Sequence, residues 1–218
     1  MEGVIAVISG DVISSTKIKE REHLIDVFHD MPNEVAHISK CKGSTLYRGD
    51  SYQIEIERAE EALRIAIILR LLLKTNTPKG ENINKSNGLW DMRVSIGVGT
   101  VSFRSEDVET SDGKAYQLSG RNLSKIGKQN LIITTPWQEV NDELEVSTAF
   151  ADDIITNWTF SQSQVMLEML LNEEIMQKQI AEKLNKSPQS ISMLLKAAKS
   201  SNIIRYIERY ESLILNKK

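Results

Sequence analysis

Residues that build disulfide or metal frameworks are nearly absent from this sequence. Its 218 residues include one cysteine, Cys41, and three histidines, His23, His29 and His37. One cysteine cannot form an internal disulfide, and the histidines lie along one expected helix without ligand partners at metal-binding spacing. We therefore expect no disulfide-stabilised fold and no zinc site, and we interpret Cys41 as a packing residue.

Long hydrophobic runs and a large charge imbalance are missing as well. The longest apolar stretch, 66–73, is interrupted by Arg70 and falls short of the roughly 20 residues that a membrane-spanning helix needs. No basic leader or cleavage site accompanies the first apolar run. A formal net charge of −3 argues against a surface that coats nucleic acid over its whole extent, but it permits a local basic face. We expect a cytoplasmic protein with no membrane partner.

The residues that are present have ordinary globular proportions, with 40% hydrophobic and 26% charged side chains, so a folded core is expected. A buried strand is predicted at 4–9, followed by a helix at 19–38 that Pro32 kinks or splits. Strand-like runs at 45–47 and 52–56 flank a turn and predict a hairpin. The later elements are a helix at 59–74, a loop at 79–88, a strand at 92–101, a helix at 112–126 and a strand at 131–134.

This order of elements predicts an α+β fold. Strand, helix, strand, strand, helix, strand, followed by one more helix and strand, is typical of the ferredoxin-like or palm arrangement. From Trp137 onward the pattern is helical to the end of the chain. We therefore predict a palm-like domain at 1–155 and an all-α helix-turn-helix domain at 156–218.

The segment from Met176 to Lys199 carries the prediction of a helix-turn-helix. Ile180, Ala181 and Leu184 form the inward stripe of one helix, and small Ala181 allows the next helix to approach closely. A second helix is predicted to begin after the capping residue Ser187, with Pro188 in its first turn, where a missing N–H costs nothing. The pattern resembles the helix-turn-helix of sigma-factor-like and response-regulator output domains.

The outward side of the second helix suits contact with DNA. Amide and hydroxyl groups read base edges and lysines contact phosphates, and the segment 176–199 holds five lysines and one acid. The candidate DNA-binding residues are Lys186, Ser187, Gln189, Ser190, Ser192, Met193, Lys196 and Lys199. The alternative is a helical bundle whose lysine face is merely solvated.

Two acids stand at the ends of expected neighbouring strands in the palm-like region. Asp11 follows the first strand and Asp50 lies in the hairpin, so together their carboxylates can hold Mg²⁺, and a pair of such ions can clamp a triphosphate. Taken singly, Asp11 is more often a loop or cap residue than a metal ligand, and Asp50 is equally often a plain turn residue. The candidate nucleotide-binding residues are Ser14, Ser15, Thr16, Lys17 and Arg48.

A third part of the candidate nucleotide site lies downstream, in the helix predicted at 112–126. Gln117 and Arg121 are one helical turn apart, so an amide and a guanidinium on one face can meet phosphate oxygens.

Four segments together resemble the signature blocks of class III nucleotide cyclases and related palm domains. They are Ile-Ser-Gly-Asp-Val, Tyr-Arg-Gly-Asp-Ser-Tyr-Gln, Arg-Val-Ser-Ile-Gly-Val-Gly and Gln-x-x-x-Arg, ending at Arg121. Nearly the whole chain resembles the SatD family, whose members join such a region to a helix-turn-helix. The resemblance implies that Asp11 and Asp50 bind the metal, that Arg121 stabilises the transition state and that Gln117 replaces the catalytic asparagine.

The chain also departs from the cyclase pattern. Leu46 stands where cyclases have a lysine, Thr110 where they have the acid that reads the base, and Ser51 where diguanylate cyclases have a second acid. The usual base selection is therefore absent, and catalysis is either lost or altered.

Three functions follow as hypotheses. The preferred one is a dimeric DNA-binding transcriptional regulator whose palm-like domain senses a nucleotide or mediates dimerisation. The second is a metal-dependent nucleotide cyclase or nucleotidyltransferase that acts on a triphosphate, with Arg121 reaching across a homodimer. The third is a protein-interaction module that binds neither DNA nor nucleotide.

Overall fold

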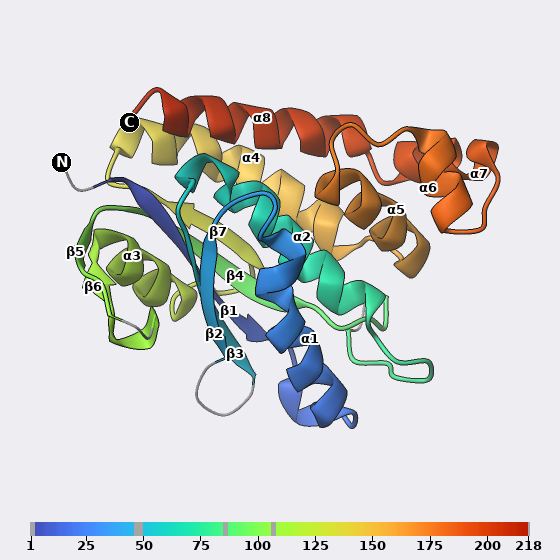
Figure 1. The fold of residues 1–218 in the computed structure, drawn as a ribbon, viewed down its shortest axis with the longest axis horizontal. Helices are drawn as coiled ribbons and strands as arrows, with labels where there is room; N and C mark the ends of the chain where they lie inside the picture. Colours follow the sequence, from blue (N-terminus) through green and yellow to red (C-terminus); the bar gives the residue numbers. More distant parts are fainter. Residues whose placement is uncertain (1–2, 46–49, 85–86, 106–107, 218) are drawn as a thin grey trace.

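The computed structural model describes residues 3–45, 50–84, 87–105 and 108–217, and these residues form a five-stranded sheet (Figure 1). Its strand order is β2-β3-β1-β4-β7, and the only parallel pair among these strands is β4 with β7. The strands are β1 (Ile5–Val12), β2 (Cys41–Thr45), β3 (Ser51–Ile56), β4 (Met92–Gly99) and β7 (Leu131–Thr134). The first four strands have the order β4-β1-β3-β2 of the ferredoxin-like arrangement, so the predicted α+β palm topology is confirmed.

Helices cover both faces of the sheet and continue to the end of the described chain (Figure 1). The helices are α1 (Arg21–Val35), α2 (Ala62–Thr75), α3 (Lys114–Leu123), α4 (Gln138–Thr156), α5 (Phe160–Leu171), α6 (Gln177–Lys183), α7 (Pro188–Ala197) and α8 (Ser200–Leu215). Short 3₁₀ turns lie at η1 (Ser15–Lys17), η2 (Ala59–Glu61) and η3 (Val108–Thr110), and a small second sheet pairs β5 (Val101–Phe103) with β6 (Asp112–Gly113). Within the described residues, no helix has the length and apolar character needed to cross a membrane.

Some element boundaries differ from the sequence predictions. Helix α1 passes through Pro32 without splitting, because the proline lies in its last turn. Strand β2 begins at Cys41, before the predicted strand at 45–47, because residues that look like a connecting loop pair with β3 in register from Cys41↔Ile56. Tyr47 lies outside the described residues.

The two faces of the sheet have different partners because successive side chains of β1 alternate between them. Ala6, Ile8 and Val12 join the main core with α1 and α2. Ile5 and Val7 point the other way, toward Ala115 and Tyr116 of α3. Asp11 lies on the α3 face by this alternation.

Helix α2 is buried around its whole circumference, from Ala62 to Lys74. A helix of this kind lies inside a protein and not on its surface. Here the sheet lies on one side and α5 and α8 on the other, and the Tyr210 hydroxyl of α8 donates to the carbonyl of Ala59 at 2.9 Å. One continuous apolar core therefore runs from the sheet into the C-terminal helices and crosses residue 155.

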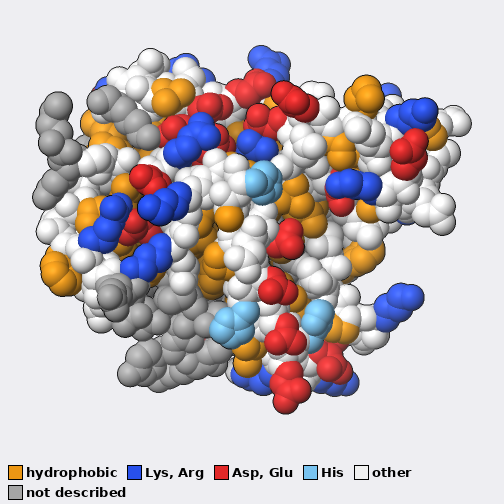
Figure 2. All heavy atoms as spheres, in the orientation of Figure 1, with side chains coloured by type: hydrophobic (Ala, Val, Ile, Leu, Met, Phe, Trp, Pro, Cys, Tyr) orange, Lys and Arg blue, Asp and Glu red, His pale blue; other side chains and the backbone are white. Residues whose placement is uncertain are grey.

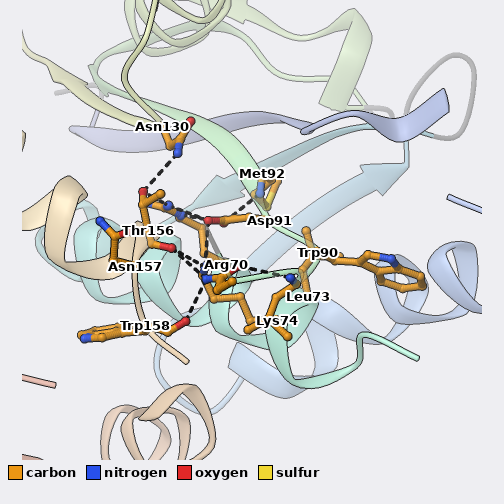
Figure 3. Close-up of polar contacts among 12 residues, drawn as sticks. Arg70, Leu73, Lys74, Trp90, Asp91, Met92, Asn130, Thr156, Asn157 and Trp158 are labelled. Carbon is orange, nitrogen blue, oxygen red and sulfur yellow. Dashed lines mark hydrogen bonds and ion pairs between the residues drawn. The ribbon is translucent and has the colours of Figure 1, made fainter. Parts of the chain in front are cut away.

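A buried ionic cluster ties these layers together (Figure 3). Arg70 of α2 contacts the carboxylates of Asp91 and Asp152, each at 2.8 Å, and Lys74 lies 3.0 Å from Asp91. Burial by itself would raise the pKa of Asp91, but Arg70 and Lys74 hold it below the ordinary value. The cluster continues to Thr156, whose carbonyl accepts from Lys74 at 3.1 Å.

Candidate functional site

The two acids predicted to bind a metal lie at the same end of neighbouring strands. Asp11 faces Ser51 in the antiparallel pairing of β1 with β3. The backbone N–H of Val12 donates to the carbonyl of Asp50 at 2.8 Å. The sheet therefore brings the backbones of Asp11 and Asp50 together, although they are far apart in the sequence.

Arg93 of β4 forms an ion pair with the carboxylate of Asp11. The two residues face each other across the strands, and Arg93 Nε donates to Asp11 Oδ1 at 2.8 Å while its Nη2 pairs with Oδ2. This hydrogen bond and the charge of Asp11 raise the pKa of Arg93. Both side chains are partly exposed, so the pair is open to solvent. Arg93 is not among the site residues predicted from the sequence, although it is the first residue of the Arg-Val-Ser-Ile-Gly-Val-Gly block.

The loop after β1 contacts the second acid. Ser15 Oγ donates to Asp50 Oδ2 at 2.9 Å. Ser14 has a left-handed backbone with φ of 56°, and the 3₁₀ turn that follows is closed by a hydrogen bond from Lys17 N to Ser14 O at 2.9 Å. Ser14, Thr16 and Lys17 are exposed, so the predicted phosphate-binding loop lies at the surface beside Asp50. Arg48 lies outside the described residues, as does Leu46.

Helix α3 packs so closely on the sheet that only glycine fits beneath it. A Cβ on Gly97 would lie 2.3 Å from the carbonyl oxygen of Ala115. On the same face, Gln53 Nε2 donates to Ser9 Oγ, which donates in turn to Ser119 Oγ of α3, each at 3.0 Å. Glycines and hydroxyls thus fix the position of α3 over β1 and β4.

Gln117 and Arg121 lie on the outer side of α3, exposed and directed away from the sheet. Gln117 Nε2 donates to Asp112 Oδ1 at 3.2 Å. In the part of the chain that the structure describes, no hydrogen bond or ion pair joins either residue to Asp11 or Asp50. In the described part of one copy, no direct contact therefore joins Gln117 and Arg121 to the two acids.

The carboxylates of Asp11 and Asp50 can bind a metal ion that also has ligands from a substrate, but they cannot enclose one by themselves. Across the described ranges, no three His, Cys, Asp or Glu side chains are grouped so that they could hold an ion. Mg²⁺ is usually bound by one or two carboxylates together with substrate phosphates and water. Asp11 and Asp50 fit a magnesium ion that arrives with a phosphate ligand, but they do not form an all-protein cage.

Helices α6 and α7 meet at a tightly capped turn. Asn185 has a left-handed φ of 51°, and Lys186 N donates to Ala181 O at 2.9 Å, which closes the end of α6. Ser187 Oγ then accepts from Ser190 N at 3.1 Å and caps α7, with Pro188 in the first turn. The turn chemistry expected from the sequence is present.

The faces of α7 divide as the helical pattern predicts. Ile191 and Leu195 are buried, whereas Met193 is 66% exposed. Exposed side chains of the candidate DNA-binding set are Ser187, Gln189, Ser190, Ser192, Met193, Lys196 and Lys199, and Lys186 is half-buried. Figure 2 shows acidic side chains gathered over α1, at the lower end of the molecule, well away from α6 and α7. The lysines of α6 and α7 thus lie apart from this acidic surface.

The chain is similar to one protein family and, more distantly, to solved cyclase structures. The sequence model described as the SatD family matches residues 4–213. No curated protein matches. A bacterial light-regulated adenylyl cyclase matches 62% of this chain and 43% of its own, with 12% identity and a TM-score of 0.41. The guanylyl cyclase Cya2 matches 62% of this chain and 77% of its own, with 17% identity and a TM-score of 0.40. The first match thus spans less than half of the adenylyl cyclase chain.

Proposed function

The chain belongs to the SatD family, and we propose that the adjoining ends of β1 and β3 bind the phosphates of a nucleotide together with Mg²⁺. The observation that supports the proposal is the pairing of β1 with β3, which brings the backbones of Asp11 and Asp50 together, with Arg93 on one acid and Ser15 on the other. Two carboxylates with an adjacent guanidinium and hydroxyl are complementary to a metal–phosphate pair.

Each residue has a distinct part in this proposal. Asp11 and Asp50 would hold the cation. Arg93, which now balances the charge of Asp11, would be free to contact a phosphate once the cation takes its place. The hydroxyls and exposed backbone of Ser14–Lys17 would receive the remaining phosphate oxygens.

The chemistry that suits this arrangement is nucleotidyl transfer or cyclisation. A bound magnesium ion would neutralise charge that develops on the phosphate oxygens. Arg121 points away from the acids of its own chain, so it would serve the site of a second copy in a homodimer. Thr110 and Gln117 differ from the usual cyclase residues, and we therefore infer a base preference unlike that of ordinary cyclases.

A thermal-shift panel tests nucleotide binding. The full chain is melted with each of the four common triphosphates, with and without Mg²⁺, because a ligand present at 1,000 times its Kd stabilises the fold by about 4 kcal/mol. Asp11→Asn should lose the shift, whereas Asp26→Asn, an exposed acid on α1, should retain it. The absence of a shift with every triphosphate would overturn the proposal.

Turnover separates an enzyme from a sensor. Chromatography of reactions with Mg²⁺ or Mn²⁺ should reveal product that Asp11→Asn and Arg121→Ala both abolish. Binding without product assigns the site to sensing instead of catalysis.

A second function, DNA binding in transcriptional regulation, is favoured by one specific observation. The capped helix α7 exposes a row of amide, hydroxyl and lysine side chains beside a short turn, as a recognition helix does. In this reading, a nucleotide at the strand ends would bias the position of two such helices in a homodimer.

Charge reversal tests the DNA proposal independently of nucleotide. The affinity for genomic fragments should fall steeply with salt, and Lys196→Glu should remove binding. Lys79→Glu, an exposed lysine in the loop after α2, is the matched control and should bind as the wild type does. Binding that ignores salt, or that survives Lys196→Glu, contradicts this function. Failure of both this test and the nucleotide panel leaves the protein-interaction reading.

A further inference from the structure

We infer that the free edge of β7 and the adjoining outer face of α4 form the contact surface between two copies of this chain. The two β7 strands would pair antiparallel about a two-fold axis, which joins the two sheets into one. This inference uses neither the strand-end acids nor the exposed face of α7, and it shares with the proposed function only the expectation of a homodimer.

The outer edge of β7 is unpaired, although the strand is only four residues long, Pro136 follows it and α4 packs against it. Within the described ranges, β7 ends the sheet and β4 is the one strand that pairs with it. Among the described residues, no backbone hydrogen bond from an element other than β4 reaches Leu131, Ile132 or Ile133. The run 131–135 contains no charged residue and no proline. Soluble proteins protect such edges with lysine, proline, a bulge or a covering segment, so an unguarded edge is a place for a partner strand.

The opposite edge of the same sheet shows what protection looks like in this molecule. At β2, Lys42 Nζ donates to the carbonyl of Ser105 at 2.6 Å, and the turn η3 packs against the strand. Lys40, whose side chain is 87% exposed, stands immediately before the strand. The β2 edge therefore has a lysine within the strand and a covering turn, whereas the lysines near the β7 edge, Lys125 and Lys128, lie in the loop before it.

The outer face of α4 extends the open edge with apolar side chains. Val146 is 62% exposed and Phe150 is 70% exposed, and small Ala149 lies between them. A hollow of about 260 Å³ follows β7 and α4, and a second of about 510 Å³ surrounds Val146 and Phe150. Gln129 and Glu145 line both hollows, so the strand edge and the apolar face are one continuous surface.

The layout of this surface favours a second copy as its occupant. An interface across a two-fold axis must be complementary to itself, with an apolar centre and a polar rim. Here Val146, Ala149 and Phe150 occupy the middle of the outer face of α4, exposed Glu145 stands beside them, and Asp142 and Asp153 bound the face at either end.

Antiparallel strand pairing also leaves both copies of α4 on the same face of the joined sheet, where Ala149 permits their close approach. Lys125 and Lys128, exposed in the loop that leads into β7, supply the opposite charge at the same edge.

Sedimentation of the full chain over a range of concentrations tests the inference. The wild type should form a dimer, and Phe150→Glu should weaken the dimer by at least about 100-fold, because a charge replaces the apolar centre. Phe103→Glu is the matched control, since Phe103 is 60% exposed on β5, away from this surface. A wild type that is monomeric at about 100 µM, or a dimer indifferent to Phe150→Glu, would overturn the inference.

Disulfide cross-linking tests where the two-fold axis lies. It also provides a second measurement in case Phe150→Glu fails to fold. Ala149→Cys should cross-link two chains rapidly under mild oxidation, whereas Ser201→Cys, exposed on α8, should not. Equal cross-linking at both positions would contradict the assigned surface. If the dimer survives Phe150→Glu while the nucleotide panel succeeds, the edge inference fails and the proposed function stands.

Discussion

At the scale of single residues, Cys41 combines partial exposure with an unreactive thiol. Burial raises the pKa of Cys41 to about 12 from an ordinary value of 9.0, and its Sγ donates to the carbonyl of Ser39 at 3.1 Å. Thiolate, and not thiol, is the nucleophile toward alkylating reagents. The lone cysteine therefore behaves as a packing residue, as its isolation in the sequence suggests.

We predict slow alkylation of native Cys41. At pH 8 the raised pKa leaves far less thiolate than in the unfolded chain, and the reaction with iodoacetamide should slow by at least about 10-fold, because the higher nucleophilicity of a more basic thiolate offsets only part of the loss. Mass spectrometry of the native chain and of the chain in urea measures both rates, with the denatured chain as the control. Equal rates would mean that the thiol is not protected by the fold.

At the scale of elements, the α6–α7 turn illustrates what a sequence specifies locally. The cap Ser187, the proline after it and the inward stripe of Ile191 and Leu195 are encoded within a few residues, so the turn and both helices could be predicted. The strands β1 and β4 were predictable for the same reason. The strands β5 and β6 could not be predicted, because strands of three and two residues are too short to show a periodicity.

Replacement of the cap should weaken this turn by a modest amount. Ser187→Ala removes the acceptor for Ser190 N, so we expect a loss of about 1 kcal/mol in the free energy of unfolding. Ser192→Ala, exposed on the same helix, should change stability by less than about 0.5 kcal/mol. Urea titrations of the three proteins measure the difference, and equal losses in both variants would argue against the cap.

Ion pairs between residues far apart in the sequence are the feature of this structure that the sequence does not predict. Arg70 interrupts an apolar run and, from the sequence, simply excludes a membrane span, yet it is fully buried against Asp91 and Asp152. Arg93 likewise finds Asp11 across 82 residues of sequence. Hydrophobic periodicity predicts which face of an element is buried, but partners of this kind depend on how distant elements come together.

The buried cluster makes a strong prediction for Asp91. Asp91→Asn removes the carboxylate that Arg70 and Lys74 share and leaves Asp152 as the remaining counter-charge of Arg70, which should cost about 3–5 kcal/mol, whereas Glu22→Gln, at an exposed position of α1, should be nearly neutral. Urea titration at neutral pH measures both. Similar stability in the two variants would show that the cluster contributes nothing.

The same carboxylate sets a pH dependence. Its folded-state pKa lies below the ordinary value of 3.8, so its contribution is fully present above that value and is lost as the pH falls through the lower folded-state pKa. The stability of the wild type should therefore decline more steeply on acidification below about pH 4 than that of Asp91→Asn. Parallel curves for the two proteins would contradict this assignment.

At the scale of the whole molecule, the boundary between 155 and 156 stays a prediction, but the core crosses it. Trp158 is buried, and its Nε1 donates to the carbonyl of Ala198 at 2.9 Å. Asn87 Nδ2 donates to the carbonyls of Thr156 and Trp158, each at 2.9 Å. The topology changes from palm to helices near this point, while the packing does not.

Truncation should show whether the palm-like region folds alone. A chain that ends at Ile155 loses α5 and α8, and therefore uncovers the flank of α2 on which they pack and removes Thr156 from the ionic cluster. A helix that is apolar on every side does not remain stably folded with one flank in water. We expect the truncated chain to aggregate or to unfold without a cooperative transition. The full chain should unfold once, with tryptophan fluorescence and circular dichroism coinciding. A cooperative transition in the truncated chain, or two separate transitions in the full one, would instead establish 1–155 as an independent domain.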